Sequence, residues 1–355
     1  MRVPHYAARS LLALTLAGLL AGCGKDSTAP DAPFDPAGTS SDIEGMQSSF
    51  DSPAMEGYAS ATASISAVLG ESPAAAAVRA APTKALVAGG KRGATAYAVT
   101  LAKAYRRPGG GGQASVSAAA IPAEYLGVTF TFNTDSGKYL PSELTGAPED
   151  GVRFVVYAIN PISGVPVEPL VEVGHADIVT TETANAITVQ VLLVSGGVTY
   201  LDYSVGATGN ASGLTLAVSG YVTNGDDRVN FDLDNQLSET ALSIDYVLTV
   251  PTRGGFRLAI ELGATETTST ADVEVRGEHG RVHLSGSTTD GAGALDVEVN
   301  GELLAIITLS PDAEPVVTGA EGQALTEDEL EALRNIILVV GAGLDFFEDL
   351  IDPIG

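Results

Sequence analysis

The feature that most constrains the fold is a long series of short alternating segments between residues 123 and 310. In residues 227–234 (DRVNFDLD), for example, apolar side chains alternate with asparagine and aspartate. A period of two predicts strands that bury one face and leave the other in water. Turn dipeptides such as Asn224-Gly225, Asp290-Gly291 and Asn300-Gly301 separate neighbouring segments and favour tight hairpins. No helix-length periodic segment interrupts the series, so we expect an antiparallel meander.

The predicted fold is therefore mainly β, with one large curved antiparallel sheet whose apolar face needs a cover. A content of 41 glycines and no tryptophan suits many short strands joined by tight turns. The predicted strands are 127–133, 152–159, 167–180, 186–194, 198–207, 213–222, 227–234, 241–250, 255–263, 271–276, 281–287, 294–300 and 302–309.

The C-terminal segment supplies a candidate for that cover. Thr326 and Glu329 form a capping-box pattern, and the apolar residues Leu330, Leu333 and Ile337 then begin a stripe at spacings of three and four. This pattern predicts an amphipathic helix over 326–351 that packs on the apolar face of the sheet. A membrane-inserted hairpin is the alternative, and the acidic residues within 345–349 disfavour it because charges are costly in lipid.

The first 23 residues carry a second strong pattern. Arg2 and Arg9 give a positive start, residues 11–20 are almost wholly apolar, and small residues follow before Cys23, which is the only cysteine. This arrangement is typical of a secretory signal peptide over residues 1–22, too short for a comfortable transmembrane helix. The four residues Leu20-Ala21-Gly22-Cys23 resemble the lipobox of bacterial lipoproteins.

The resemblance implies that the Cys23 thiol receives a diacylglyceryl group and that a type II signal peptidase, recognising Leu20, Ala21 and Gly22, cuts before it. Several acyl chains together give stable membrane anchoring. Gly24, rather than an aspartate, implies delivery to the outer membrane where the host has one. The alternative is an ordinary signal peptide with an incidental cysteine.

The remainder of the chain divides by composition. Residues 23–42 are rich in Pro, Ser, Asp and Gly, which predicts a disordered tether that carries the acylated Cys23. Residues 43–107 predict short helices, because Ser41 and Glu44 form a capping box and Ser52-Pro53 is a helix start. Residues 108–122 predict a glycine-rich linker, and 123–355 form the β domain.

Charge is distributed unevenly along this chain. The formal net charge is −26, and residues 123–355 hold 8 basic and 36 acidic residues, so nucleic-acid binding is excluded as a function. Residues 79–107 contain seven basic residues and no acidic one. Two interpretations stay open for this segment, namely contact with anionic lipid headgroups and packing or solvation beside the acidic body.

No catalytic or metal-binding motif rises above background, and we predict no enzyme activity, cofactor or metal. His279 and His283 have a metal-ligand spacing, but a glycine separates them at a predicted hairpin. An aspartate cluster could hold calcium, yet alternation also explains it as a solvated strand face. Tyrosines could line a ligand surface or lie at the core edge. The aspartates are Asp226, Asp227, Asp232 and Asp234, and the tyrosines are Tyr58, Tyr97, Tyr105, Tyr200, Tyr203, Tyr221 and Tyr246.

These patterns together predict a lipid-anchored cell-envelope protein of structural or interaction type. Its partners would be a membrane, through the acyl chains on Cys23, and an envelope protein. The expected architecture is similar to half-barrel lipoprotein-carrier and lipid-binding folds, without shared motifs. The alternative function is therefore a carrier that holds an apolar ligand, such as a lipid, between the sheet and the C-terminal helix.

Overall fold

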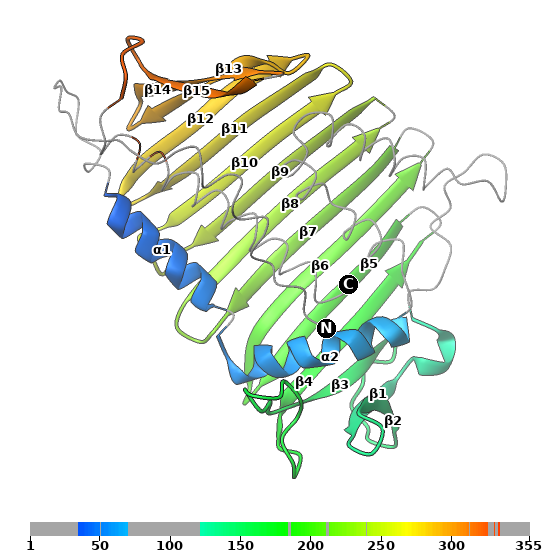
Figure 1. Ribbon diagram of the computed structural model, residues 1–355. Helices are drawn as coiled ribbons and strands as arrows, with labels where there is room; N and C mark the ends of the chain where they lie inside the picture. Colours follow the sequence, from blue (N-terminus) through cyan, green and yellow to red (C-terminus); the bar gives the residue numbers. More distant parts are fainter. Residues whose placement is uncertain are drawn as a thin grey trace.

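The protein is built around one sheet of 15 strands, seen in a computed structural model (Figure 1). The structure describes residues 35–49, 51–69, 121–183, 186–210, 213–238, 240–311 and 313–325, together with Leu330 and Leu333. From β3 to β15 each strand pairs with the next along the chain, so the expected antiparallel meander is confirmed for most of the sheet. A short 3-10 helix, η2 (Ala123–Tyr125), precedes the first strand.

The strand bounds follow the predicted segments closely in the middle of the sheet. They are β1 (Val128–Asn133), β2 (Lys138–Ser142), β3 (Gly151–Tyr157), β4 (Glu172–Glu182), β5 (Ala186–Ser195), β6 (Val198–Asn210), β7 (Gly213–Thr223), β8 (Arg228–Ser238), β9 (Ala241–Val250), β10 (Phe256–Thr265), β11 (Thr268–Gly277), β12 (Gly280–Thr289), β13 (Ala292–Val299), β14 (Glu302–Ser310) and β15 (Ala313–Gly319).

Two strands at the edges of the sheet were not predicted. Strand β2 forms one edge and β15 the other, and each contains a proline, Pro141 and Pro315. Proline cannot donate to the ladder and is tolerated at edges, where it also discourages pairing with other chains. The purely antiparallel prediction is also wrong at this end, because β1 pairs parallel to β3 and antiparallel to β2, making the sheet mixed.

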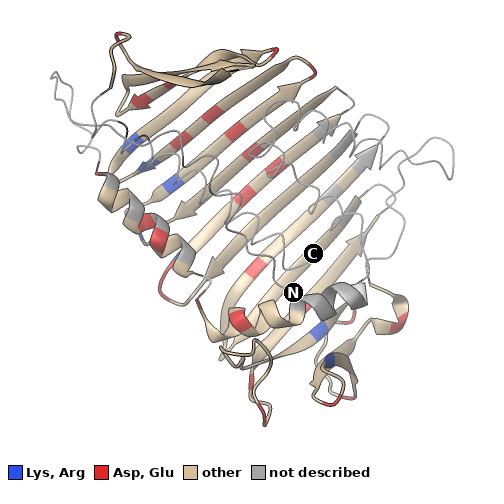
Figure 2. Ribbon diagram, in the orientation of Figure 1, with Lys and Arg blue, Asp and Glu red and all other residues tan. Residues whose placement is uncertain are grey.

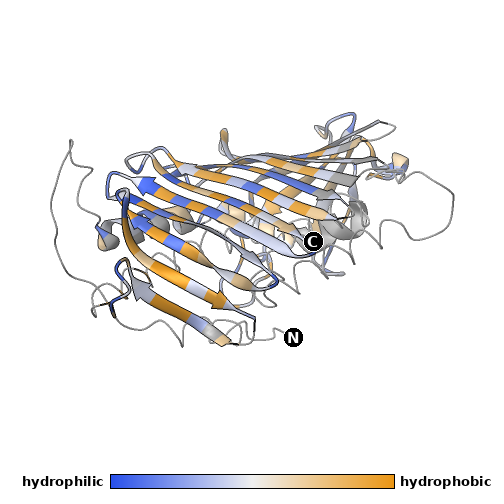
Figure 3. Ribbon diagram, turned by 90° about the horizontal axis from the view of Figure 1, so that it is seen from above, coloured by the Kyte–Doolittle hydropathy of each residue, from blue (hydrophilic) through white to orange (hydrophobic). Residues whose placement is uncertain are grey.

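Alternation of side chains gives the sheet one buried and one exposed face. In β9, Leu242, Ile244, Tyr246, Leu248 and Val250 are buried, and the residues between them are exposed or partly so. Cross-strand registers keep the apolar rows on the same face from β3 to β14, and this inner face holds the core. Figure 3 shows the resulting bands of apolar and polar residues alternating along the strands. The predicted apolar face is confirmed.

Tight turns set these registers. Asp290 and Asn300 adopt positive φ angles of 50° and 52°, and the glycines that follow them have 84° and 83°. Two successive residues with positive φ make a type I′ turn, whose twist matches that of the flanking strands. Asp290-Gly291 and Asn300-Gly301 therefore act as two-residue hairpin turns, as predicted, whereas Asn224-Gly225 belongs to the longer connection 224–227 between β7 and β8.

The first helix begins earlier than the sequence analysis predicts. Helix α1 spans Pro36–Ser48, so residues 36–42, which we assigned to the tether, are helical. Asp35 starts it, because its carboxylate accepts a hydrogen bond from the Ala37 amide (3.0 Å) and its carbonyl accepts one from Thr39. Aspartate at the N-cap followed by proline is a strong start signal, and here it lies before the predicted Ser41–Glu44 box.

Helix α2 (Pro53–Leu69) begins where the sequence predicts, with the Ser52 hydroxyl accepting a hydrogen bond from the Met55 amide (3.2 Å). It crosses the inner face beside β2 to β5 (Figure 1). Gly57 lies directly against Val156 and the carbonyl of Tyr157, which permits this close approach. Tyr58 of α2 and Tyr203 of β6 are both buried in the same apolar core, which ties the helix to the middle of the sheet.

Other predicted segments fall outside the described residues. These are the signal peptide, the first part of the tether, residues 70–107 and the linker up to residue 120. The helix predicted over 326–351 also lies outside them, apart from Leu330 and Leu333. Leu333 is completely buried in the same apolar core as the strands, and Leu330 packs against that core.

Gly220 provides a test of the tight cross-strand packing. Gly220 pairs with Tyr203 on β6 and with Phe231 on β8. The centroids of these two aromatic rings are 6.3 Å apart. A Cβ atom at Gly220 would collide with the carbonyl of Asp202 and the backbone of Tyr203. We expect Gly220→Ala to lower the free energy of unfolding by about 1–3 kcal/mol in urea denaturation.

Gly206→Ala is the matched control for this experiment. A Cβ atom there would find its nearest neighbours, the Ala217 carbonyl and the Thr188 hydroxyl, at 3.9 Å. The substitution should therefore leave the free energy of unfolding unchanged or slightly raised. Equal stability of the two variants would contradict the described packing.

Candidate functional site

The exposed face of the sheet carries a row of carboxylates at opposed positions. Asp234 of β8 pairs with Asp245 of β9, which pairs with Glu261 of β10 and then Asp272 of β11. Asp296 continues the row on β13, beyond one serine on β12, and all five side chains are exposed. We call these five residues the acidic row. Like charges directly opposite each other destabilise a sheet, and screening by solvent and salt reduces this repulsion without removing it.

A second charged row lies nearer the strand ends that face α1. Arg257, Arg276 and Arg281 occupy directly opposed positions on β10, β11 and β12, and we call them the arginine trio. All three contact Glu274, at 3.2 Å, 3.6 Å and 2.7 Å respectively. One carboxylate is thus the ion-pair partner of three guanidinium groups. Figure 2 shows basic bands gathered at the α1 end of these strands and acidic bands farther along them.

His283 contacts one carboxylate of the acidic row and a second carboxylate on the next strand. Its Nε2 atom lies 3.0 Å from Asp272 of the acidic row, and its Nδ1 atom lies 3.5 Å from Glu298 on β13. On β3 and β4, Arg153 forms a two-pronged ion pair with Asp177, with both contacts at 2.6 Å. Burial and the nearby Arg153 charge lower the pKa of His175 beside this pair, so neutral imidazole is favoured there.

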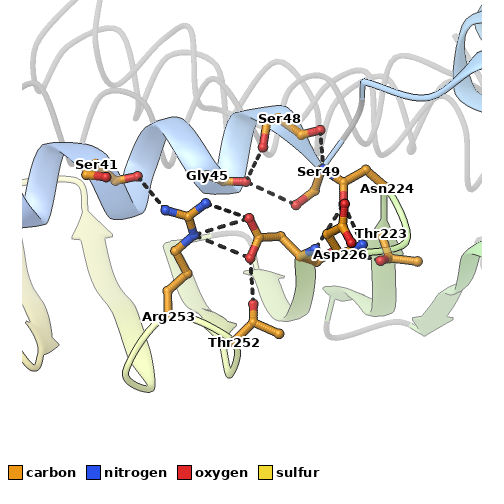
Figure 4. A network of polar contacts seen from close by, with 10 residues as sticks. Ser41, Gly45, Ser48, Ser49, Thr223, Asn224, Asp226, Thr252 and Arg253 are labelled. Carbon is orange, nitrogen blue, oxygen red and sulfur yellow. Dashed lines mark hydrogen bonds and ion pairs between the residues drawn. The ribbon is translucent and has the colours of Figure 1, made fainter.

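Polar contacts at the hairpin turns hold α1 in place (Figure 4). Arg253, in the β9–β10 turn, pairs with Asp227 at 2.7 Å and donates to the Ser41 carbonyl of α1 at 3.3 Å. Asn224, in the β7–β8 turn, donates to the Ser48 carbonyl at the end of the helix (3.0 Å). The Arg253 guanidinium, with Thr252, lowers the pKa of Asp227 and keeps that carboxylate charged.

His279, in the β11–β12 turn, contacts the first residues of the same helix. Its carbonyl accepts a hydrogen bond from the Asp35 amide (2.8 Å), and its ring lies 3.7 Å from the Asp35 carboxylate and 3.8 Å from Asp42. Gly38 and Gly45, two turns apart on α1, approach the His279 ring and the Arg253 guanidinium so closely that no Cβ would fit without a shift. Together these contacts form the turn clamp on α1.

Asp42 is the buried carboxyl group of the turn clamp. Its side chain is buried, and its Oδ2 atom makes no hydrogen bond with the residues that the structure describes. Burial raises the pKa of Asp42, and the charges of His279 and Arg253 offset this only in part. The carboxyl group is therefore easier to bury in its protonated form.

The structure does not bring the sequence-predicted site residues together. Leu20, Ala21, Gly22 and Cys23 lie outside the described residues, so lipidation stays a prediction. His279 and His283 contact different acidic groups, as given above. In the part of the chain that the structure describes, no group of three or more His, Cys, Asp or Glu side chains has a geometry that could hold a metal ion.

The predicted aspartate cluster and tyrosines also have separate places. Asp227 pairs with Arg253 in the turn clamp, Asp226 is exposed in its turn, and Asp232 and Asp234 lie on the exposed strand face. Among the tyrosines, Tyr58, Tyr203 and Tyr246 are buried, Tyr200 packs against the core, and Tyr221 lies under the guanidinium of Arg228. Tyr97 and Tyr105 lie outside the described residues.

Sequence reasoning missed the arginine trio and the turn clamp. A signal for the trio was present, because a two-residue turn at Glu278-His279 necessarily places Arg276 opposite Arg281. For the clamp the signals were Asp35-Pro36 as a helix start and two glycines seven residues apart.

Comparison with known proteins adds no assignment. No family model, no curated protein and no solved structure matches this chain. Among the described residues, no helix is both long and apolar enough to cross a membrane.

Asp42 gives a pH-dependent prediction. A raised pKa in the folded state means that the carboxyl group destabilises the fold increasingly as the pH rises above its ordinary pKa of 3.8. We expect Asp42→Asn to increase the free energy of unfolding near neutral pH and to have little effect at about pH 4. Urea denaturation of both proteins across this range measures the difference.

Glu44→Gln is the control, because Glu44 is exposed on the same helix. Its effect should be small and should not grow with pH. A loss of stability in Asp42→Asn at neutral pH would show instead that the charged carboxylate supports α1.

Proposed function

We propose that this protein is a lipid-anchored component of the bacterial cell envelope with a structural or interaction role. Cys23 would carry the acyl chains, with Leu20, Ala21 and Gly22 as the recognition residues for the signal peptidase. Support for the anchor comes from the lipobox-like residues and the preceding apolar stretch. In this proposal Gly24 directs the protein to the outer membrane where one is present.

The observation that carries the interaction role is the ordered charge on the exposed sheet face. The acidic row spans β8 to β13, and it opposes like charges at a cost in stability. A partner with complementary charge would remove that cost on binding and would gain specificity from the arrangement. A broad, rigid β surface also presents its side chains at fixed spacings, which suits recognition of an envelope protein.

A non-enzymatic role is part of the proposal. Its support lies in where the charged side chains sit, because the two charged rows lie on an open face, whereas catalytic groups usually work in a site that excludes water. His283 is paired with Asp272 and Glu298 on this face, beside other paired charges.

Carriage of an apolar ligand is the second candidate, and the observations favour it less. Side chains of the inner face are already buried by the protein's own chain, with Val229, Leu248 and Val297 fully inaccessible. Leu333, from the predicted C-terminal helix, is buried in the same core. A lipid held between sheet and helix would therefore have to displace existing contacts.

Metabolic labelling tests the anchor directly. We expect radiolabelled palmitate to enter the wild-type protein in a bacterial host and the protein to fractionate with membranes. Cys23→Ala should abolish labelling and release the protein or leave its signal peptide uncut. Because Ser27 lies outside the lipobox, Ser27→Ala is the control and should label normally. Wild-type protein without label would overturn the proposal.

A further inference from the structure

We propose that the arginine trio, Arg257, Arg276 and Arg281, binds the phosphate groups of anionic phospholipids and so orients the sheet on the membrane. The inference deepens the proposed function and rests on it, since the anchor at Cys23 supplies the nearby bilayer. It concerns β10 to β12, whereas the basic segment 79–107 lies outside the described residues.

The first argument is the concentration of positive charge in an acidic body. Residues 123–355 contain only 8 basic residues, and three of them occupy directly opposed positions on adjacent strands. Among the described residues, Glu274 is the one carboxylate in ion-pair contact with the trio, so three guanidinium groups share a single negative partner. Three opposed guanidinium groups repel one another, so an added anion would stabilise the arrangement.

The second argument is the availability of donors. Glu274 is contacted by Nη1 of Arg257 and by Nε of Arg276 and Arg281, so most N–H donors of the trio take no part in these contacts. Arg276 and Arg281 have side-chain exposures of 57% and 42%, so both can reach a ligand in solution. Planar guanidinium groups bind phosphate through paired N–H donors, which gives both strength and orientation.

The third argument is the position at which the N-terminal segment first contacts the sheet. The Asp35 amide bonds to the carbonyl of His279, and His279 lies in the turn that joins the strands of Arg276 and Arg281. Cys23 precedes Asp35 by twelve residues, and such a length spans at most about 40 Å when fully extended. An acylated Cys23 therefore keeps the bilayer within that distance of Asp35, which is bonded to the turn between the strands of Arg276 and Arg281.

Net negative charge of the protein does not prevent this contact. Arg276 and Asp272, of the acidic row, are four residues apart on β11, which corresponds to about 13 Å along a strand. The Debye length at physiological ionic strength is about 8 Å, so the phosphate at the trio is largely screened from the acidic row.

Vesicle binding by the unacylated chain tests the proposal. We would use the chain from residue 24 onward, which contains every described residue, with vesicles of phosphatidylcholine with and without phosphatidylglycerol. Wild type should bind only the anionic vesicles, and Arg276→Gln should bind about fivefold more weakly. Arg276 makes a single 3.6 Å contact with Glu274, so this change should leave the fold intact.

Lys138→Gln is the matched control, because it removes one positive charge from an exposed residue on the edge strand β2. It should bind as the wild type does. A second variant replaces the trio and Glu274 together by glutamine, which avoids leaving Glu274 without partners, and it should lose most binding. Circular dichroism and urea denaturation check that each variant is folded.

Several outcomes would overturn the proposal. These are no binding of wild type to anionic vesicles, equal losses in Arg276→Gln and Lys138→Gln, and calorimetric binding of inorganic phosphate without binding of vesicles. The experiment uses no acyl chain, so its failure leaves the palmitate test untouched, and failure of palmitate labelling would be seen separately.

Discussion

Strict alternation of apolar and polar side chains along neighbouring antiparallel strands is the constraint on which the rest of this structure depends. It places the continuous apolar rows on one face from β3 to β14 and the charged rows on the other, although β3 also buries Val155 on its opposite face. A one-residue slip at any strand would reverse both faces, so the type I′ turns that fix the registers matter as much as the core. The inner face must be covered, and α2 covers part of it, while α1 lies at the strand ends and is held by the turn clamp.

Local sequence patterns were enough to predict the central strands. They failed where the structure depends on residues distant in the sequence, or where a strand or helix has an untypical sequence. Strands β2 and β15 carry Pro141 and Pro315, which argue against a strand unless it lies at an edge, and edge position is a property of the whole sheet. The parallel pairing of β1 with β3 depends on a crossing connection that no local signal specifies. The start of α1 at Asp35-Pro36 was hidden because the same residues are typical of a flexible tether.

Candidate site residues were harder to predict, because the sheet joins residues from different strands rather than residues close in sequence. His279 and His283 are four residues apart, yet the turn directs them to different partners. Arg257 and Arg281 are far apart in sequence, yet both contact Glu274. These groupings follow from the cross-strand registers, which require all turn lengths to be known. Charged residues on the exposed face are also free of packing constraints. Their alternation therefore predicts that the face is solvated, but it does not predict which residue of a neighbouring strand each charge contacts.

Hydrogen–deuterium exchange of backbone amides tests the central claim, which is that β2 to β15 form one continuous sheet. Amides of β6 to β10 should be protected most strongly, because each strand is paired on both sides, and protection should fall gradually toward β2 and β15. The same strands should lose protection together on addition of urea, as one cooperative unit. Two groups of strands that exchange independently, or central strands that exchange as fast as the edges, would contradict the account.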